Sequence, residues 1–365
     1  MRLTSSHPRA VPIWTGLAAV LLWFGGVANA AAQADPPTPQ TAPTTSAIPS
    51  NFSFAIETGV RYEKNIALSG DRVASGEAIF GDNNGDTTAG IAAVVDYAAI
   101  AEPGRELVFT ARPFYEKVDE FDDLSNFGIS VSAAYRGEFG SAFTAPWYAL
   151  SVGYTAIQFT DSDIRDGGWL DAELAVGARF SPRFGLSGGI RYFDRNQSDT
   201  SDLCPAMADG RCPGEDAGDF ADWNADSVFE NSKWGLFAHA DWFITSRTQV
   251  FVEYSFWDGE EATSSSFNGL GGTNPLLGSD TFAEDPAFGN FNAGGTPQPV
   301  LVWRLDARQH VFEVGIRQTI TDKLSVDLTG IRLLTGDAES VDRVMPNVDE
   351  YRNTAVELGL RYRVN

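Results

Sequence analysis

Charged residues recur at a fixed spacing in three short segments of this chain. Segments 57–61, 313–317 and 357–361 each carry Glu first, Gly in the middle and Arg last, and segment 189–192 repeats the Gly-x-Arg part. On a β-strand, residues two apart share a face, so Glu, Gly and Arg would lie together, opposite the mostly apolar residues between them. Such a face could set the ion selectivity of a water-filled pore. It could equally neutralise a narrow interior by pairing across strands.

The same parity on the other predicted strands extends this charged face to a set of both signs. Its members are Glu57, Arg61, Asp96, Arg112, Arg136, Glu173, Arg179, Arg191, Asp241, Glu253, Glu313, Arg317, Asp327, Glu357 and Arg361. These residues are the candidates for an interior lining, and both interpretations of their chemistry stay open.

Catalysis needs a nucleophile beside a base. After the N-terminal segment the chain has only His239 and His310. His310 shares the apolar parity, whereas Ser255 on the preceding strand has the interior parity. His239 has the interior parity beside Asp241, which is typical of a hydrogen-bonded filler. We therefore expect no catalytic site and no cofactor.

The links between strands offer two further candidate contacts. Cys204 and Cys212 are the only cysteines and lie close together in a polar segment, which in an exported protein predicts a local disulfide. Asp82, Asn84 and Asp86 alternate in an earlier link and could contact a divalent cation, although their glycine is misplaced for an EF-hand loop. A solvated acidic surface is the simpler interpretation, and we predict no firm metal site.

The N-terminal segment predicts export. Residues 1–30 combine an early positive charge, an apolar run and the small-residue sequence Ala28-Asn29-Ala30, which is typical of a cleaved signal peptide. Residues 31–50 are rich in Pro, Thr and Ala and predict a spacer without a core. The folded part is expected to span 51–365 as one domain.

Alternation of apolar and polar residues predicts about twelve strands in 51–365. Their ranges are 52–62, 91–97, 107–115, 127–135, 148–154, 170–180, 184–192, 234–244, 250–256, 312–320, 324–328 and 356–364. The links alternate between short and mostly longer, and the longest, 258–309, contains several Phe and Leu residues. We expect it to fold over or into a mouth as a constriction.

Composition and aromatic placement favour a membrane barrel over a soluble sandwich. Tyr and Trp on the apolar faces gather at strand ends, as at membrane interfaces. The chain has 49 Asp and Glu against 26 Lys and Arg, a net charge of −23, which argues against nucleic acid as a partner.

On these features the chain resembles a Gram-negative outer-membrane β-barrel over residues 51–365. The resemblance implies an antiparallel up-and-down barrel with short periplasmic turns, long extracellular loops and a location in the outer membrane, among lipid and lipopolysaccharide. The last strand, with alternating Leu358, Leu360, Tyr362 and Val364, is similar to the C-terminal signal read by the barrel-assembly machinery, although the chain ends in Asn365 instead of Phe or Trp. A narrow channel for small solutes is the expected function. The alternative is a non-conducting structural, adhesive or export-associated barrel acting through its acidic loops.

Overall fold

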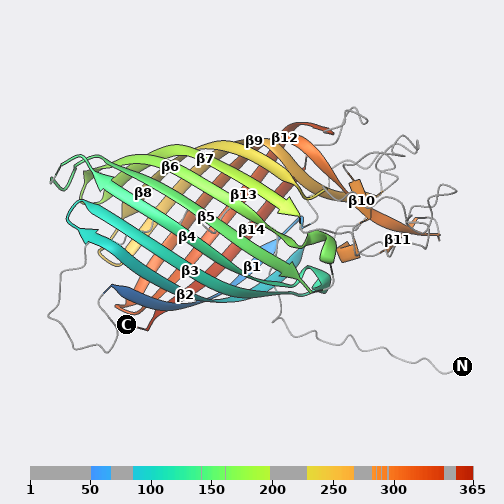
Figure 1. The fold of residues 1–365 in the computed structure, drawn as a ribbon, viewed down its shortest axis with the longest axis horizontal. Helices are drawn as coiled ribbons and strands as arrows, with labels where there is room; N and C mark the ends of the chain where they lie inside the picture. Colours follow the sequence, from blue (N-terminus) through green and yellow to red (C-terminus); the bar gives the residue numbers. More distant parts are fainter. Residues whose placement is uncertain are drawn as a thin grey trace, which may run out of the picture.

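The computed structural model describes residues 51–66, 85–140, 142–160, 162–197, 228–266, 282–284, 286–288, 290–293, 296–340 and 351–364. The predicted signal peptide, spacer and disulfide lie outside these residues. Twelve strands form the barrel wall in Figure 1: β1 (Phe52–Glu63), β2 (Asp86–Glu102), β3 (Arg105–Val118), β4 (Asn126–Glu138), β5 (Trp147–Phe159), β6 (Gly167–Ser181), β7 (Phe184–Gln197), β8 (Asn231–Phe243), β9 (Thr248–Ser266), β12 (Thr296–Thr321), β13 (Leu324–Ser340) and β14 (Arg352–Arg363).

The wall is a closed ring of antiparallel neighbours. Consecutive strands pair along the chain, β9 pairs with β12, and β14 pairs back onto β1 with Arg61 opposite Glu357. Two short strands, β10 (Phe282–Glu284) and β11 (Asn290–Ala293), pair with the outer part of β12 and do not belong to the ring. The predicted all-β fold and the count of twelve strands are confirmed.

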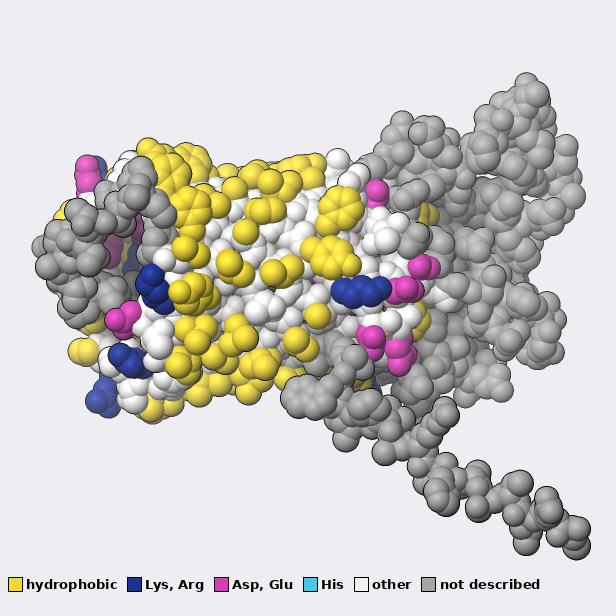
Figure 2. All heavy atoms as spheres, turned by 90° about the horizontal axis from the view of Figure 1, so that it is seen from below, with side chains coloured by type: hydrophobic (Ala, Val, Ile, Leu, Met, Phe, Trp, Pro, Cys, Tyr) yellow, Lys and Arg dark blue, Asp and Glu magenta, His cyan; other side chains and the backbone are white. Residues whose placement is uncertain are grey.

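Side chains alternate between the two surfaces of the wall as the sequence predicts. On β7, Ile190 is 52% exposed, whereas its neighbours Gly189 and Arg191 face the interior. Figure 2 shows apolar side chains gathered around the middle of the wall and charged ones towards its two ends. An apolar exterior around a charged interior is the reverse of a soluble protein and is the arrangement of a membrane barrel.

Exposed aromatic rings lie near both ends of the wall. At the end with the short links, Tyr135 lies 6.0 Å from Tyr148, measured between ring centroids. At the end with the long links, the Tyr254 and Phe312 rings are 5.1 Å apart. We call these the short-link end and the long-link end. The chain's last described residues lie at the short-link end, opposite β10 and β11 (Figure 1).

Both predicted bounds of the link 258–309 are wrong. β9 continues to Ser266 and β12 begins at Thr296, so the two strands form a long extension that pairs up to Val300 opposite Ser266. The sequence prediction stopped at Asp258 because Asp258, Gly259 and two glutamates interrupt the apolar alternation. Beyond the apolar part of the wall, backbone hydrogen bonds between β9 and β12 continue the strand through these polar residues.

Two glycines let large rings approach the inside of the wall closely. A Cβ on Gly177 would lie 2.4 Å from Cζ2 of Trp147, and one on Gly315 would lie 2.3 Å from Cζ of Phe251. No side chain fits at these distances, so each glycine provides the close approach that its neighbouring ring needs. In the described part of the chain, no helix is long and apolar enough to cross a membrane.

Candidate functional site: the charged interior

One wall of the interior, formed by β14, β1, β2 and β3, carries a mixed-charge network. Arg112 Nε donates to Glu57 Oε2 at 3.0 Å, and Arg361 lies 3.5 Å from Glu57 and 3.8 Å from Asp96. The side chains of Arg112 and Glu57 remain 26% and 27% exposed. Ion pairs on this wall therefore keep contact with solvent-sized space inside the barrel.

A similar pair lies between β12 and β13. Arg317 Nε donates to Asp327 Oδ1 at 2.6 Å, and about a quarter of each side chain is exposed. Glu57 and Arg361, and Arg317 and Asp327, come from different strands, so these contacts are the cross-strand pairs that the sequence suggested. Pairing and solvent contact coexist here, and neither interpretation of the lining excludes the other.

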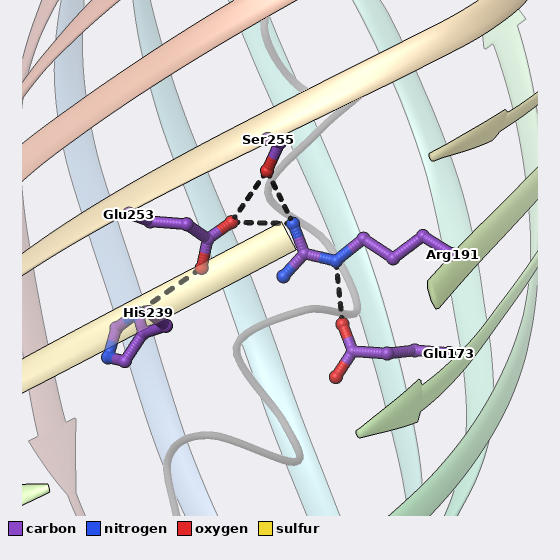
Figure 3. A network of polar contacts seen from close by, with 5 residues as sticks. All are labelled: Glu173, Arg191, His239, Glu253 and Ser255. Atoms are coloured by element: carbon purple, nitrogen blue, oxygen red, sulfur yellow. Dashed lines mark hydrogen bonds and ion pairs between the residues drawn. The ribbon is translucent and has the colours of Figure 1, made fainter. Parts of the chain in front are cut away.

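The opposite wall holds a buried network centred on Arg191 (Figure 3). Arg191 Nε donates to Glu173 Oε2 at 2.7 Å, and its Nη1 donates to Glu253 Oε1 at 2.5 Å and to Ser255 Oγ at 3.1 Å. The guanidinium carbon lies 3.9 Å from the centre of the Phe237 ring. The side chains of Arg191, Glu173 and Glu253 are only 9%, 7% and 15% exposed.

His239 completes this network. Its Nδ1 lies 3.2 Å from Glu253 Oε2, and its ring stacks on Phe251 at 5.9 Å between centroids. Across the β9–β12 ladder Glu253 stands opposite Glu313, so two carboxylates meet at this level. The arrangement holds charge in a packed environment and gives β6, β7, β8 and β9 a shared structural anchor.

The His and Ser residues weighed for catalysis lie on different surfaces. His310 is on the exterior, where its Nδ1 lies 2.8 Å from the hydroxyl oxygen of Tyr254 and its ring packs near Phe256. Ser255 faces the interior, where it donates to Glu253 and accepts from Arg191. The barrel wall thus separates the two side chains.

The other candidate lining residues face the interior at several levels. Arg61 pairs with Glu63 at 2.8 Å and stands opposite Glu357. Asp241 lies against Gly185, where a Cβ would come within 2.8 Å of its Oδ2. Arg136 and Arg179 lie at the short-link end against aromatic rings. That the whole set lines a path for solutes stays a prediction.

Two apolar clusters of described residues lie at the long-link end. The first contains Ile66, Val118, Leu124, Ala287 and Phe288. The second contains Ile164, Val228, Phe229 and Val302. Phe288 lies in η5 (Pro286–Phe288) on the β9–β12 connection, and its ring centroid is 5.0 Å from that of Phe121, beside η1 (Asp122–Leu124). Since β12 and β4 are on opposite sides of the ring, this contact crosses the opening.

A cluster of buried polar side chains near the long-link end was not predicted from the sequence. Lys233 Nζ contacts Glu261, and Gln309 Nε2 donates to Glu261 Oε2 at 2.9 Å and to the Tyr351 hydroxyl at 2.8 Å. Burial raises the pKa of Tyr351 well above its usual range, so its hydroxyl stays protonated. Continuing the interior parity of β9 past Asp258 would have found Glu261.

Asp171 is a second missed residue. It has the interior parity of Glu173 on β6, and both of its carboxylate oxygens are buried without a hydrogen-bond partner. Its parity alone would have placed it in the lining.

Asp86 has a structural use in this fold. Its carboxylate accepts the backbone N–H groups of Glu120 and Phe121 at 3.1 and 2.8 Å and holds the β3–β4 link. Asp82, Asn84, Cys204 and Cys212 lie outside the described residues, so the cation contact and the disulfide stay predictions. Among the described residues, no group of three or more His, Cys, Asp or Glu side chains could hold a metal ion.

Comparison with known proteins assigns no family. No family model and no curated protein matches the chain. Among solved structures, an outer membrane channel from Pseudomonas putida F1 matches at 11% identity, covering 89% of this chain and 100% of that one, with a TM-score of 0.44. A KdgM porin in complex with disordered oligogalacturonate matches at 7% identity over 84% and 98%, with a TM-score of 0.37.

A translocator domain of the autotransporter NalP from Neisseria meningitidis matches at 10% identity over 87% and 90%, with a TM-score of 0.36. The matches thus include both channels and autotransporter barrels. The class of protein defined here, a closed 12-strand antiparallel β-barrel, rests on the strand pairing described above.

Proposed function

We propose that this protein is an outer-membrane channel that passes small polar or charged solutes. The observation that carries the proposal is the interior wall of β14, β1, β2 and β3. Its charged side chains are about a quarter exposed although they point into a closed barrel. These side chains border space that solvent could occupy, and a lining of both signs of charge beside such space supports a small-solute channel.

The exterior supports a membrane location. Side chains such as Ile190, Val152 and Leu358 are about half exposed around the middle of the wall, where water would penalise them and lipid would not. An exported chain with this surface fits the outer membrane, since closed barrels leave no unpaired strand edge in hydrocarbon. In this proposal residues 1–30 are removed as a signal peptide and residues 31–50 form a spacer before the barrel.

The width of the path is limited by what crosses the long-link end. The contact between Phe288 and Phe121 spans the opening, and Val302 on the β12 extension packs against Ile164 and Phe229. A twelve-strand barrel is already narrower than a sixteen-strand porin. These two facts favour small solutes and a constriction near the outer mouth.

The channel is tested by permeation of liposomes that contain the refolded full-length protein. Uncharged solutes of graded size should enter, with a sharp cut-off at small size, and the rate should rise when the Phe288 contact is removed. Protein that is folded by heat-modifiable migration, yet admits none of the solutes, would contradict the proposal.

A non-conducting barrel is the second candidate, and the apolar clusters at the long-link end favour it. If those clusters close the opening completely, the function would reside in the acidic outer links and a partner of the barrel. We propose no enzymatic role, because His310 contacts Tyr254 on the exterior whereas Ser255 lies inside the wall.

A further inference from the structure

The short-link end of this acidic protein is locally basic. We count the charged side chains in the short links and within two residues of each strand end on this side of the barrel. Eight of these side chains are basic and five are acidic. The basic ones are Arg105, Arg136, Arg179, Arg183, Arg247, Lys323, Arg361 and Arg363, and the acidic ones are Glu102, Glu106, Glu138, Asp241 and Asp322. With a net charge of −23 for the whole chain, this end stands out as the one that would attract anions.

Arg136 lies on an aromatic platform at this end. Its guanidinium carbon is 4.6 Å from the centre of the Trp147 ring, and the Trp147 ring in turn lies close to Gly177 of β6. The nearest carboxylate, on Glu138, lies at 3.9 Å, which is too far for a hydrogen bond. About a quarter of the Arg136 side chain is exposed.

Arg179 is held between two rings. Its guanidinium carbon lies 5.4 Å from the ring centres of both Phe143 and Phe243. In the described part of the chain it has no ion pair with a carboxylate. Stacking on aromatic faces fixes the position of a guanidinium while leaving its in-plane N–H groups unused.

These two residues differ from three other interior arginines. Arg191, Arg112 and Arg317 each donate to a carboxylate at 2.6 to 3.0 Å, so their charge and at least one donor are already engaged. Arg136 and Arg179 have comparable chain positions on alternate strands, but neither donates a hydrogen bond to a carboxylate. Stacked, partly exposed arginines with free planar donors are suited to bidentate recognition of carboxylate or phosphate oxygens.

We infer that Arg136 and Arg179, with Trp147, Phe143 and Phe243, form a binding site for small anions at the short-link mouth of the interior. The ligand class is a small solute carrying carboxylate or phosphate groups. This inference rests on the proposed channel function and names the kind of solute that the channel would prefer. In the orientation expected for such barrels, the site faces the periplasm.

The test uses citrate as a carboxylate probe and inorganic phosphate as a second probe. Binding to the refolded full-length protein in detergent is measured by calorimetry, and block of ion current is measured with the probe on each side of a planar bilayer. We expect binding, and block at lower concentration from the short-link side. The double variant Arg136→Gln, Arg179→Gln should weaken both by about tenfold or more, because two charge-assisted contacts are lost.

A matched control removes the same charge from exposed turns at the same end. Arg183→Gln with Arg247→Gln should change citrate affinity by less than about twofold, since general attraction over a Debye length is screened by salt. If the two double variants weaken binding equally, the stacked site is refuted. Should the first variant fail to fold, Arg136→Lys with Arg179→Lys keeps the charge, loses the planar donors, and should still bind more weakly than the unmodified protein.

The outcomes separate this inference from the proposed channel. A conducting protein that neither binds nor is blocked by citrate or phosphate overturns the anion site and leaves the channel intact. An electrically silent protein that binds citrate through Arg136 and Arg179 overturns the channel and supports the site.

Discussion

Replacing Arg191 by Met should strongly destabilise the barrel, because two carboxylates would lose their shared partner in a packed environment. Glu173 and Glu253 accept from Arg191 at 2.7 and 2.5 Å, and their side chains are 7% and 15% exposed. Breaking a buried ion pair from one side costs about 3–5 kcal/mol. The lost stacking on Phe237 adds about 0.5–2 kcal/mol.

The control is the same change at Arg112. Its pair with Glu57 is about a quarter exposed, and Glu57 keeps Arg361 at 3.5 Å after the change. A solvent-contacting pair contributes about 0–1 kcal/mol, so Arg112→Met should cost little. The difference between the two variants reports how much water each wall of the interior receives.

The assay is equilibrium unfolding in denaturant of the protein in lipid vesicles, followed by tryptophan fluorescence. Adding Glu173→Gln and Glu253→Gln to Arg191→Met should restore at least half of the loss, because the unpaired charges are removed together. Equal costs for Arg191→Met and Arg112→Met would refute the division of the interior into a packed wall and a hydrated wall.

Three further changes test other parts of the structure. Ile190→Arg places a charge in the middle of the exterior belt and should cost about 2–4 kcal/mol in vesicles, whereas Ile190→Leu should not; a small cost for the arginine would mean that this surface does not meet lipid. Asp171→Ala removes a carboxylate without a hydrogen-bond partner and should raise the free energy of unfolding by about 1 kcal/mol. An unchanged free energy of unfolding would indicate that water hydrates the Asp171 carboxylate. Phe288→Ala removes the contact with Phe121 and should raise single-channel conductance, and identical conductance would show that this contact does not narrow the path.

Much of the fold follows from the sequence because the apolar belt imposes a strict alternation. Each strand crosses the same apolar layer, so the parity of Ile190 and Arg191 is legible from residue types alone. The twelve strands were therefore predictable, whereas the role of the candidate lining residues on them stays a prediction. Above the belt this signal ends, because both faces of a strand can then be polar.

The parts that the sequence did not predict all depend on contacts between distant segments. The extensions of β9 and β12 are held by their mutual ladder, and Glu261 lies inside only because β9 continues past Asp258. The contact of Phe288 with Phe121 joins residues far apart in the chain, and the expected folding of this link over the mouth stays a prediction. Likewise, the stacking of Arg179 between Phe143 and Phe243 needs two strands and a turn to be placed first.

The measurement that tests the central claim most directly is the conductance of the refolded full-length protein in a planar bilayer. We expect stable current steps whose reversal potential shifts with a salt gradient, because in the proposed channel a hydrated interior lined by charged residues such as Glu57 and Arg361 would connect the two sides. Silence from protein shown to be folded and inserted would contradict it. The interior would then be closed, and the function would lie in the outer links.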